Sequence, residues 1–416
     1  MNKNLLIGVE PKLAEALDSL ISLFDNRTML WFARLYDPQT GAFYYSNSGR
    51  DYEGFGPDLE STVQGLRCVE SRGMLDNYGC SLKAALPKDI TNKLLNFTIS
   101  CADRDGYYYH PQWGKNITVQ RRGRDLTWAE QIYEWFDAKP PYPTATQLLA
   151  QGEQNKNDEN TALPDYFKSR AAYIDYLDSL DFAHKSYPAG NTLNAQYPQI
   201  KAAGLLEATC EYLIAHQNAK NGLWEDEITY DSVSGLMKVA GFFGNAGIKL
   251  PNFEKAIDSC IDATLSDIPA AAVVQVYNPH SAVCSLTGGM KQMGDADAVA
   301  YSKKRYLDSI VPLIEKTRDK LTVFRKPDGS FSYMPNRSAC KSQGAPVAIY
   351  MENEGDVNAT TIAMSGGVGM LLHNLGMPFK IYDHKDFSEF ISVLAAQTPV
   401  RKKPVPVGRE SSPGRF

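Results

Sequence analysis

The residue types best suited to chemistry are concentrated between Asp103 and Glu130, where aromatic side chains accompany arginines and acids. Aromatic faces stack on sugar rings, and an arginine guanidinium binds a carboxylate or sulfate through paired hydrogen bonds. The segment therefore indicates a saccharide site, including one for an anionic glycan. In the alternative, the tyrosines pack between helices and the arginines lie in solvent. The residues expected to bind substrate are Tyr107, Tyr108, Tyr109, Trp113, Arg121 and Arg122, with Trp224, His280 and Asp356 farther along the chain.

Acidic residues near predicted helix starts could provide hydrolytic chemistry. Glycoside hydrolysis needs one protonated carboxyl group to assist the leaving group and one ionised carboxylate as base or nucleophile. Carboxyl groups that face one another can have the separated pKa values that these roles require. The alternative for each aspartate is a helix cap, and for the histidine a structural position. The predicted catalytic residues are Asp58, Glu60, Asp125, Glu130 and His110.

An elimination reaction on a uronate is a second possibility. It needs a base, commonly Tyr or His, and an Arg or Asn that neutralises the uronate carboxylate. Tyr109, His110 and Arg121 could fill these roles, as could Asn278 and His280. Asn278 precedes a proline, so we expect a turn there that leaves His280 near the start of a helix, although such a turn could be a plain helix cap.

Turns that combine glycine with an aromatic residue recur along the chain. Their glycines are Gly41, Gly106, Gly222 and Gly329, which are 65, 116 and 107 residues apart. The last two intervals are about twice one period, so we expect two degenerate units, near Pro164 and near residues 277–280. The chain would then hold about six units of roughly 55 to 60 residues, each long enough for two helices.

A polar motif that begins with aspartate follows each of these turns, at Asp58, Asp125, Asp231 and Asp356. An aspartate at a helix start accepts hydrogen bonds from the unpaired amides of the first turn and lies at the positive end of the helix dipole. We therefore expect each aspartate to open a helix. If these are the inner helices of a ring, their carboxylates surround one mouth of it.

Helical periodicity dominates the sequence and strand-like alternation is scarce. Leu13, Leu17, Leu20, Ile21 and Phe24, for example, recur at helical spacing. The predicted fold is all-α, a closed (α/α)6 toroid of helical hairpins joined by the Gly-aromatic turns. An open superhelix of helix pairs is the competing arrangement.

The repeats resemble those of the α/α-toroid proteins, especially the terpenoid cyclase and protein prenyltransferase superfamily with its Asp-Gly-Ser-Phe/Trp repeats. The closest matches are Lys326-Pro-Asp-Gly-Ser-Phe331 and Asp356-Val-Asn-Ala-Thr-Thr361, and the repeat style covers most of residues 28–375. The resemblance implies architecture, because folds of this kind also host polysaccharide lyases and glycoside hydrolases.

Isoprenoid chemistry is disfavoured, because the Asp-x-Asp-Asp acid of class II terpene cyclases and the zinc-binding motifs of prenyltransferases do not occur. Toroidal lyases often carry a β-sandwich, for which this chain has no room, so a glycoside hydrolase ranks above a polysaccharide lyase. The other candidate is a non-catalytic toroid that binds a glycan, peptide or protein.

Composition supports a soluble globular protein. The 416 residues are 43% hydrophobic and 22% charged, and the formal net charge of -5 argues against a general nucleic-acid binder. No stretch reaches the roughly 18 apolar residues that span a membrane. Seven scattered cysteines without a Cys-x-x-Cys pair, and a start without an export signal, favour the cytoplasm and predict neither metal nor cofactor.

One domain over residues 1–396 is predicted, followed by a basic, proline-rich tail over 397–416 that we expect to be disordered. Residues 150–163 are polar and are predicted to form an exposed loop.

Overall fold

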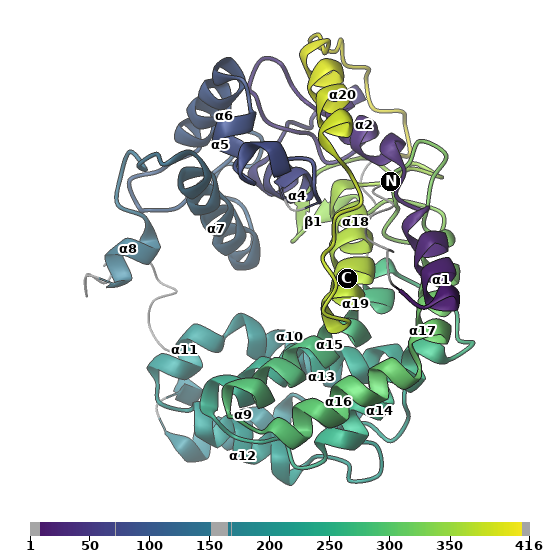
Figure 1. Cartoon of the computed structure of the whole chain (residues 1–416). Coiled ribbons are helices and arrows are strands. Elements are labelled where there is room, and N and C mark those ends of the chain that lie inside the picture. The colour runs from purple at the N-terminus through teal and green to yellow at the C-terminus, as the bar shows by residue number, and fades with distance from the viewer. Residues whose placement is uncertain (1–8, 71, 151–164, 168, 410–416) are drawn as a thin grey trace.

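The computed structural model describes residues 9–70, 72–150, 165–167 and 169–409, and its elements are almost all helices (Figure 1). This confirms the predicted all-α class. The strands of the described residues are β1 (Lys341–Ser342) and β2 (Ala345–Pro346), which pair antiparallel across the turn at Gln343 and Gly344. Within these ranges, no helix combines the length and apolar character needed to cross a membrane.

Most helices follow one another in pairs along the chain. The pairs are α2 (Asn26–Arg34) with α4 (Leu59–Glu70), α6 (Lys88–Ser100) with α7 (Val119–Phe136), α9 (Arg170–Ser179) with α10 (Phe182–Ala195), α12 (Leu206–Ala215) with α13 (Tyr230–Ala246), α14 (Phe253–Leu265) with α15 (Val273–Gln292), and α17 (Ile310–Thr322) with the run α18 (Val357–Thr361), η4 (Ile362–Met370) and α19 (Leu371–Asn374). The other α-helices are α1 (Pro11–Ile21), α3 (Asn47–Asp51), α5 (Leu82–Ala85), α8 (Ala145–Ala150), α11 (Tyr197–Ala202), α16 (Ala296–Asp308) and α20 (His384–Ala395).

The two helices of a pair differ in burial. Helix α6 buries Ile90, Leu94 and Thr98, which lie four residues apart on one face, whereas its remaining residues are half-buried or exposed. Helices α4 and α13 are buried along most of their length. We call the second helix of each pair its inner helix, because the second helices contact one another in series, although α14 of the fifth pair is buried about as much as α15.

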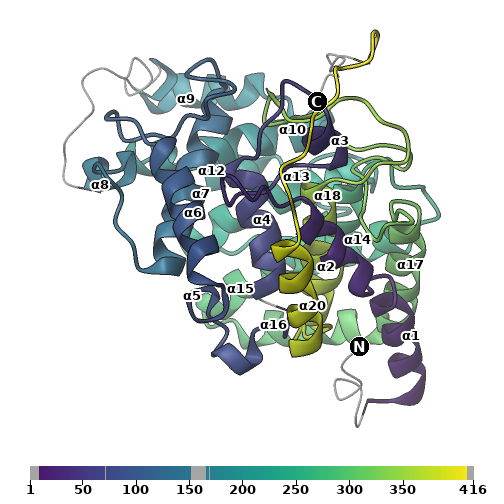
Figure 2. The ribbon, with the colours of Figure 1, turned by 90° about the horizontal axis from the view of Figure 1, so that it is seen from above.

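The inner helices contact one another in series. Helix α7 packs on α4, α4 on α18, the η4 segment that continues α18 on α15, α15 on α13, and α13 on α10. Seen from above, α4 and α18 lie between α6 on one side and α17 on the other (Figure 2). The buried core follows this series through the whole molecule.

The four predicted turn glycines each have a positive φ, between 72° and 92°, which favours glycine. Each turn also approaches another helix. A Cβ atom at Gly222 would lie 2.5 Å from the amide nitrogen of Ala256 in α14, and one at Gly329 would lie 2.6 Å from that of Thr28 in α2. The Gly329 turn follows α17, so this contact joins the last helix pair to the first.

A helix begins at three of the four predicted starts, and at two of them the aspartate itself is the cap. Asp58 and Asp356 accept hydrogen bonds from amides in the first turns of α4 and α18. Asp231 is the second residue of α13, whose cap is Thr229. Asp125 does not open a helix, because Thr118 caps α7 and Asp125 lies in its interior.

The predicted turn at Asn278 is also wrong. Pro279 and His280 lie inside α15, which continues through the proline and packs against both α13 and η4. Tertiary packing on two sides outweighs the local cost of proline in a helix.

Two further predictions fall wholly or partly outside the described residues. The expected unit near Pro164 and the loop over 150–163 lie there, apart from Ala150 at the end of α8. Of the predicted tail, Lys403 exchanges backbone hydrogen bonds with Asp51 and Glu53, and the Lys402 ammonium lies 4.6 Å from the ring centroid of Tyr44.

Candidate functional site

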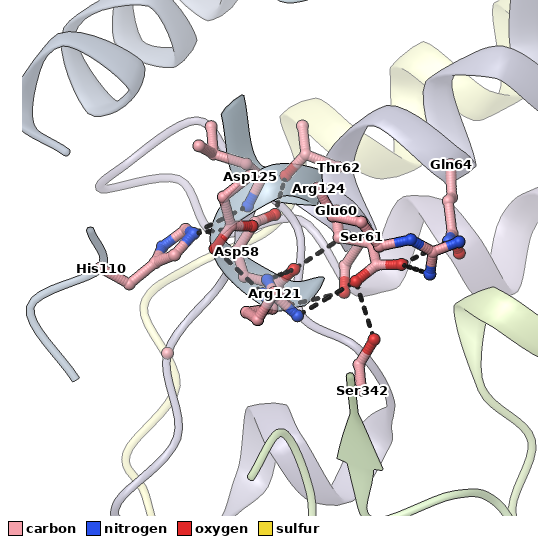
Figure 3. A network of polar contacts seen from close by, with 12 residues as sticks. Asp58, Glu60, Ser61, Thr62, Gln64, His110, Arg121, Arg124, Asp125 and Ser342 are labelled. Carbon is pink, nitrogen blue, oxygen red and sulfur yellow. Dashed lines mark hydrogen bonds and ion pairs between the residues drawn. The ribbon is translucent and has the colours of Figure 1, made fainter. Parts of the chain in front are cut away.

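Six of the predicted site residues, Arg121 of α7 among them, meet in one place. Figure 3 shows five of them, namely Asp58, Glu60, His110, Arg121 and Asp125. The Arg121 guanidinium group contacts three carboxylates, with Nη2 2.9 Å from Asp58 Oδ1, Nη1 3.1 Å from Glu60 Oε2, and Nε 3.0 Å from Asp125 Oδ2. Arg121, Asp58 and Asp125 are completely buried and Glu60 nearly so. We call these residues, with His110, Trp113 and Arg124, the Arg121 cluster.

Two helix starts bring the acids to Arg121. Asp58 caps α4, accepting from the Ser61 amide at 2.9 Å and the Ser61 hydroxyl at 2.7 Å, while its Oδ1 also accepts from Arg121. Glu60 projects from the first turn of α4, and Asp125 lies one helical turn beyond Arg121 on α7. The capping role predicted as the alternative for Asp58 is therefore real, and it coexists with the ion pair.

The second Gly-aromatic turn supplies His110 and Trp113. The His110 Nε2 atom lies 3.6 Å from Asp125 Oδ1 and 3.5 Å from the Leu59 amide nitrogen, and Nδ1 lies 3.8 Å from the Cys101 sulfur. The Trp113 ring covers the Arg121 guanidinium, with 4.5 Å from Cζ to the ring centroid. This is a cation–π contact in a desolvated position, where such contacts are strongest.

The charges of the Arg121 cluster balance. Burial acts to lower the pKa of His110, but its contacts with Asp125 and Cys101 outweigh burial and raise it to about 10. For Asp125, burial acts to raise the pKa, and the charges of Arg121 and His110 lower it overall. Glu60 also accepts from Arg124 Nη1 at 2.7 Å, so three cations face three carboxylates. Such a set favours cohesion, because buried charges are tolerated when paired.

The hairpin of β1 and β2 covers the cluster. The Ser342 hydroxyl donates to Glu60 Oε2 at 2.7 Å, the Trp113 indole donates to the Pro346 carbonyl at 3.0 Å, and the Thr118 hydroxyl donates to the Gln343 carbonyl at 2.6 Å. No local pattern predicts this hairpin, because its partners are more than 200 residues away in the chain.

The described residues include no group of three or more His, Cys, Asp or Glu side chains arranged for a metal ion. At the centre of Asp58, Glu60 and Asp125, Arg121 occupies the position that a cation would take.

Other predicted residues in the 103–130 segment lie apart from Arg121. Glu130 accepts from the Thr144 hydroxyl at 2.6 Å. The Tyr108 ring is buried against Tyr133, with 6.3 Å between centroids. Tyr107 stacks with Arg122 at 4.6 Å from Cζ to the ring centroid. The Tyr109 hydroxyl donates to Asp105 at 2.9 Å. These contacts fit the alternative in which the tyrosines pack against neighbouring elements, and they do not bring the residues into one site.

Trp224 and His280 occupy core positions away from the cluster. The Trp224 indole donates to the Leu213 carbonyl at 2.9 Å. His280 Nε2 lies 2.9 Å from the Thr317 hydroxyl and Nδ1 lies 2.6 Å from the Tyr306 hydroxyl. Burial and the charge of Lys320 lower the pKa of His280 to about 3, so its ring is neutral.

Asp356 forms a second acidic group with Glu354. Glu354 accepts from the hydroxyls of Ser48 at 2.8 Å and Ser338 at 3.2 Å, and Asp356 accepts from the Ala359 amide at 2.7 Å. Burial raises the pKa of Glu354 to about 7 and that of Asp356 to about 6, against the hydrogen bonds that lower both. Burial, with smaller contributions from the charges of Asp356 and Glu60, raises the pKa of the Tyr45 phenol.

A third group, of which Asn278 alone was predicted as a candidate, joins several inner helices. It consists of Arg124 of α7, Tyr187 of α10, Lys238 of α13, Asn278 of α15 and Tyr333 of the fourth Gly-aromatic turn, and we call it the central cluster. The Lys238 ammonium lies 5.7 Å from the Tyr187 ring centroid. Arg124 acts electrostatically on both Lys238 and Tyr333, and Tyr187 acts on Tyr333 as well.

The central cluster is partly exposed, unlike the Arg121 cluster. Arg124, Tyr187, Lys238 and Tyr333 are intermediate in exposure, and Asn278 is buried. No local motif could have revealed it, because each member comes from a different element and only the fold brings them together.

Comparisons with protein-family models, with curated proteins and with solved structures gave no match to this chain.

Proposed function

We propose that the chain is an (α/α)6 toroid that binds an oligosaccharide or polysaccharide at the central cluster. The observation that carries the proposal is the convergence of partly exposed phenols and cations from α7, α10, α13 and the fourth turn on the buried Asn278 amide of α15. Sugar hydroxyls need several hydrogen-bonding groups around an aromatic surface, and this set supplies both.

The toroid itself is supported by the series of inner-helix contacts from α7 to α10 and by the Gly329 turn, which meets α2. An open superhelix would leave its last pair far from its first.

The chemistry of the site favours binding over cleavage. Asp58 and Asp125, two of the carboxylates expected to hydrolyse a glycosidic bond, are fully buried on Arg121 and covered by the hairpin. Burial raises the pKa of Tyr187, so its phenol stays protonated and donates hydrogen bonds. Neither a free carboxylate pair nor an ionised phenol is therefore supplied at neutral pH.

Elimination on a uronate is the second candidate. It is favoured by one observation, the placement of the Lys238 cation and the Asn278 amide around the Tyr187 phenol. In this reaction the cation and the amide would neutralise the uronate carboxylate, and the Tyr187 phenolate would remove the neighbouring proton as the glycosidic C–O bond breaks. Because the pKa of Tyr187 is raised, this step would need alkaline solution.

Calorimetric titration of the full chain with neutral and uronate oligosaccharides tests the proposal, with reducing ends and the absorbance of unsaturated products measured in parallel. We expect binding that Tyr187→Ala and Tyr333→Ala both weaken, while Tyr142→Ala on the exposed loop before α8 does not. Unsaturated products would favour the elimination reaction, new reducing ends alone would favour hydrolysis, and no binding by any saccharide would refute the proposal.

A further inference from the structure

Lys238 is a cation without a carboxylate partner among the described residues. It lies on α13 where α10 approaches closely, since a Cβ atom at Gly190 would be 2.9 Å from Lys238 Cβ. This close approach holds the lysine stem between the two helices and directs the ammonium toward Tyr187. Burial and, to a lesser extent, the charge of Arg124 lower the pKa of Lys238, because both disfavour a second positive charge in this part of the molecule.

Arg124 contributes a second cation, which is paired with a carboxylate but still partly exposed. Its Nη1 atom donates to Glu60 at 2.7 Å, and its side chain remains 40% exposed. The charges of Glu60 and Arg124 are already counted in the balance of the Arg121 cluster. The positive charge of Lys238 comes in addition, and no carboxylate of that cluster compensates it. Two further carboxylates act on the phenols of the central cluster. Asp231, which is exposed at the start of α13 and accepts from Gln275 at 3.4 Å, acts on Tyr187. Asp356, which is buried and accepts from the Ala359 amide, acts on Tyr333.

The groups around the two cations are neutral donors. The phenols of Tyr187 and Tyr333 both have raised pKa values, chiefly from burial. The amides of Asn191 and Asn278 act on the Tyr187 phenol, and Asn278 Nδ2 also donates to Ser234 at 2.7 Å. Two cations surrounded by protonated phenols and amides make a site for an anion, with donors left for hydroxyl groups.

We infer that the central cluster binds the anionic group of an acidic saccharide, a carboxylate or a sulfate, between Lys238 and Arg124. The inference rests on the proposed function for the saccharide, but the anion site can be tested without it. Each charge-assisted hydrogen bond is roughly twice as strong as a neutral one, so losing Lys238 should cost about tenfold in affinity for an acidic ligand.

The test compares the full chain with Lys238→Gln, and with Lys303→Gln as a matched control on the exposed side of α16. Each protein is titrated with a uronate trisaccharide, a sulfated trisaccharide and the unmodified neutral trisaccharide, and its thermal midpoint is measured in sodium sulfate and in sodium chloride of equal ionic strength. Circular dichroism first establishes that each variant is folded.

We expect at least one acidic trisaccharide to bind about tenfold more tightly than the neutral one, and Lys238→Gln to remove that preference while Lys303→Gln keeps it. The preferred acidic ligand identifies the anionic group.

Equal binding of acidic and neutral saccharides, unchanged by Lys238→Gln, would refute the anion site and leave the proposed function standing. Stabilisation by sulfate that needs Lys238, without binding of any saccharide, would support the anion site and refute the proposed function. An absence of both effects would refute both.

Discussion

Arg121 donates a hydrogen bond of 2.9 Å to Asp58, a residue 63 positions away in the chain, and both side chains are fully buried. The bond joins the inner helix of the second pair to the start of the inner helix of the first. The same guanidinium holds Glu60 and Asp125. Because all five donors of an arginine lie in one plane, a single side chain can fix the relative position of α4 and α7.

Arg121→Met should be strongly destabilising. The substitution leaves three buried carboxylates with only Arg124 and His110 near them, and breaking a buried ion pair on one side costs about 3 to 5 kcal/mol. Urea denaturation at pH 7 measures the loss in free energy of unfolding. Arg121→Lys should lie between wild type and Arg121→Met, because an ammonium cannot reach three carboxylates at once.

Arg104 provides the control for this substitution, because it is exposed and stacks on Tyr142 at 5.7 Å. Arg104→Met should change the free energy of unfolding by less than about 0.5 kcal/mol, as is usual for surface positions. A loss for Arg121→Met no larger than that of Arg104→Met would contradict a cohesive role for the Arg121 cluster.

His110 should make stability depend on pH in alkaline solution. Its pKa in the folded state is about 10, against about 6.5 in an unfolded chain. A raised pKa contributes stability that is fully present below about pH 6.5 and is lost as the pH rises through 10. The expected loss is on the order of a few kcal/mol, because the imidazolium beside Asp125 and Cys101 must give up its proton.

The free energy of unfolding of His110→Gln should therefore fall less than that of wild type between pH 6.5 and 10. His384→Gln, on the exposed first turn of α20, controls for the loss of any histidine. Parallel curves for wild type and His110→Gln would show that His110 is not protonated in the fold.

Glu354 should also make stability depend on pH, in a lower pH range than His110 does. Burial raises its pKa to about 7 from the ordinary 4.5, so the stability it contributes is complete below pH 4.5 and is lost as the pH rises through 7. Glu354→Gln keeps a carbonyl acceptor for the Ser48 amide and removes the buried charge. Between pH 4.5 and 8, the free energy of unfolding of this variant should fall by about 2 to 3 kcal/mol less than that of wild type.

Glu352→Gln, at an exposed position two residues away, is the matched control and should follow the wild-type curve. If Glu354→Gln also followed the wild-type curve across this range, the carboxyl group would be titrating normally in the fold.

Local patterns explain what the sequence could predict. The helical spacing of residues such as Leu13, Leu17 and Leu20 is a property of neighbouring positions, and it correctly indicated an all-α chain. The caps at Asp58 and Asp356 are local as well. Asp125 has the same sequence context, but its carboxylate pairs with Arg121 one turn earlier on the same helix, and Thr118 takes the capping position.

The sites depended on distant contacts that sequence spacing does not encode. Six of the predicted candidates do lie together in the fold, but they form an ion-paired and covered group. They are Asp58, Glu60, His110, Trp113, Arg121 and Asp125. Lys238 and Tyr187 carried no motif, and they become neighbours only because α10 and α13 pack closely at Gly190. Burial and pairing, which decide whether a carboxylate can react, follow from tertiary structure.

Gly222→Ala should reveal how firmly a Gly-aromatic turn is packed against the next helix. Gly222 has a φ of 72°, and a Cβ atom there would lie 2.5 Å from the Ala256 amide nitrogen and 2.7 Å from the Asn252 carbonyl oxygen. Gly247 has a similar φ of 66°, but no described atom lies within 4 Å of the position that its Cβ atom would take. Gly247→Ala therefore isolates the cost of the left-handed backbone, about 1 to 2 kcal/mol.

Gly222→Ala adds a backbone clash to that cost and should lower the thermal midpoint clearly further in a calorimetric scan. Equal midpoints for the two variants would mean that the turn can move away from α14 without loss, and the contact would then not fix the spacing of the helix pairs.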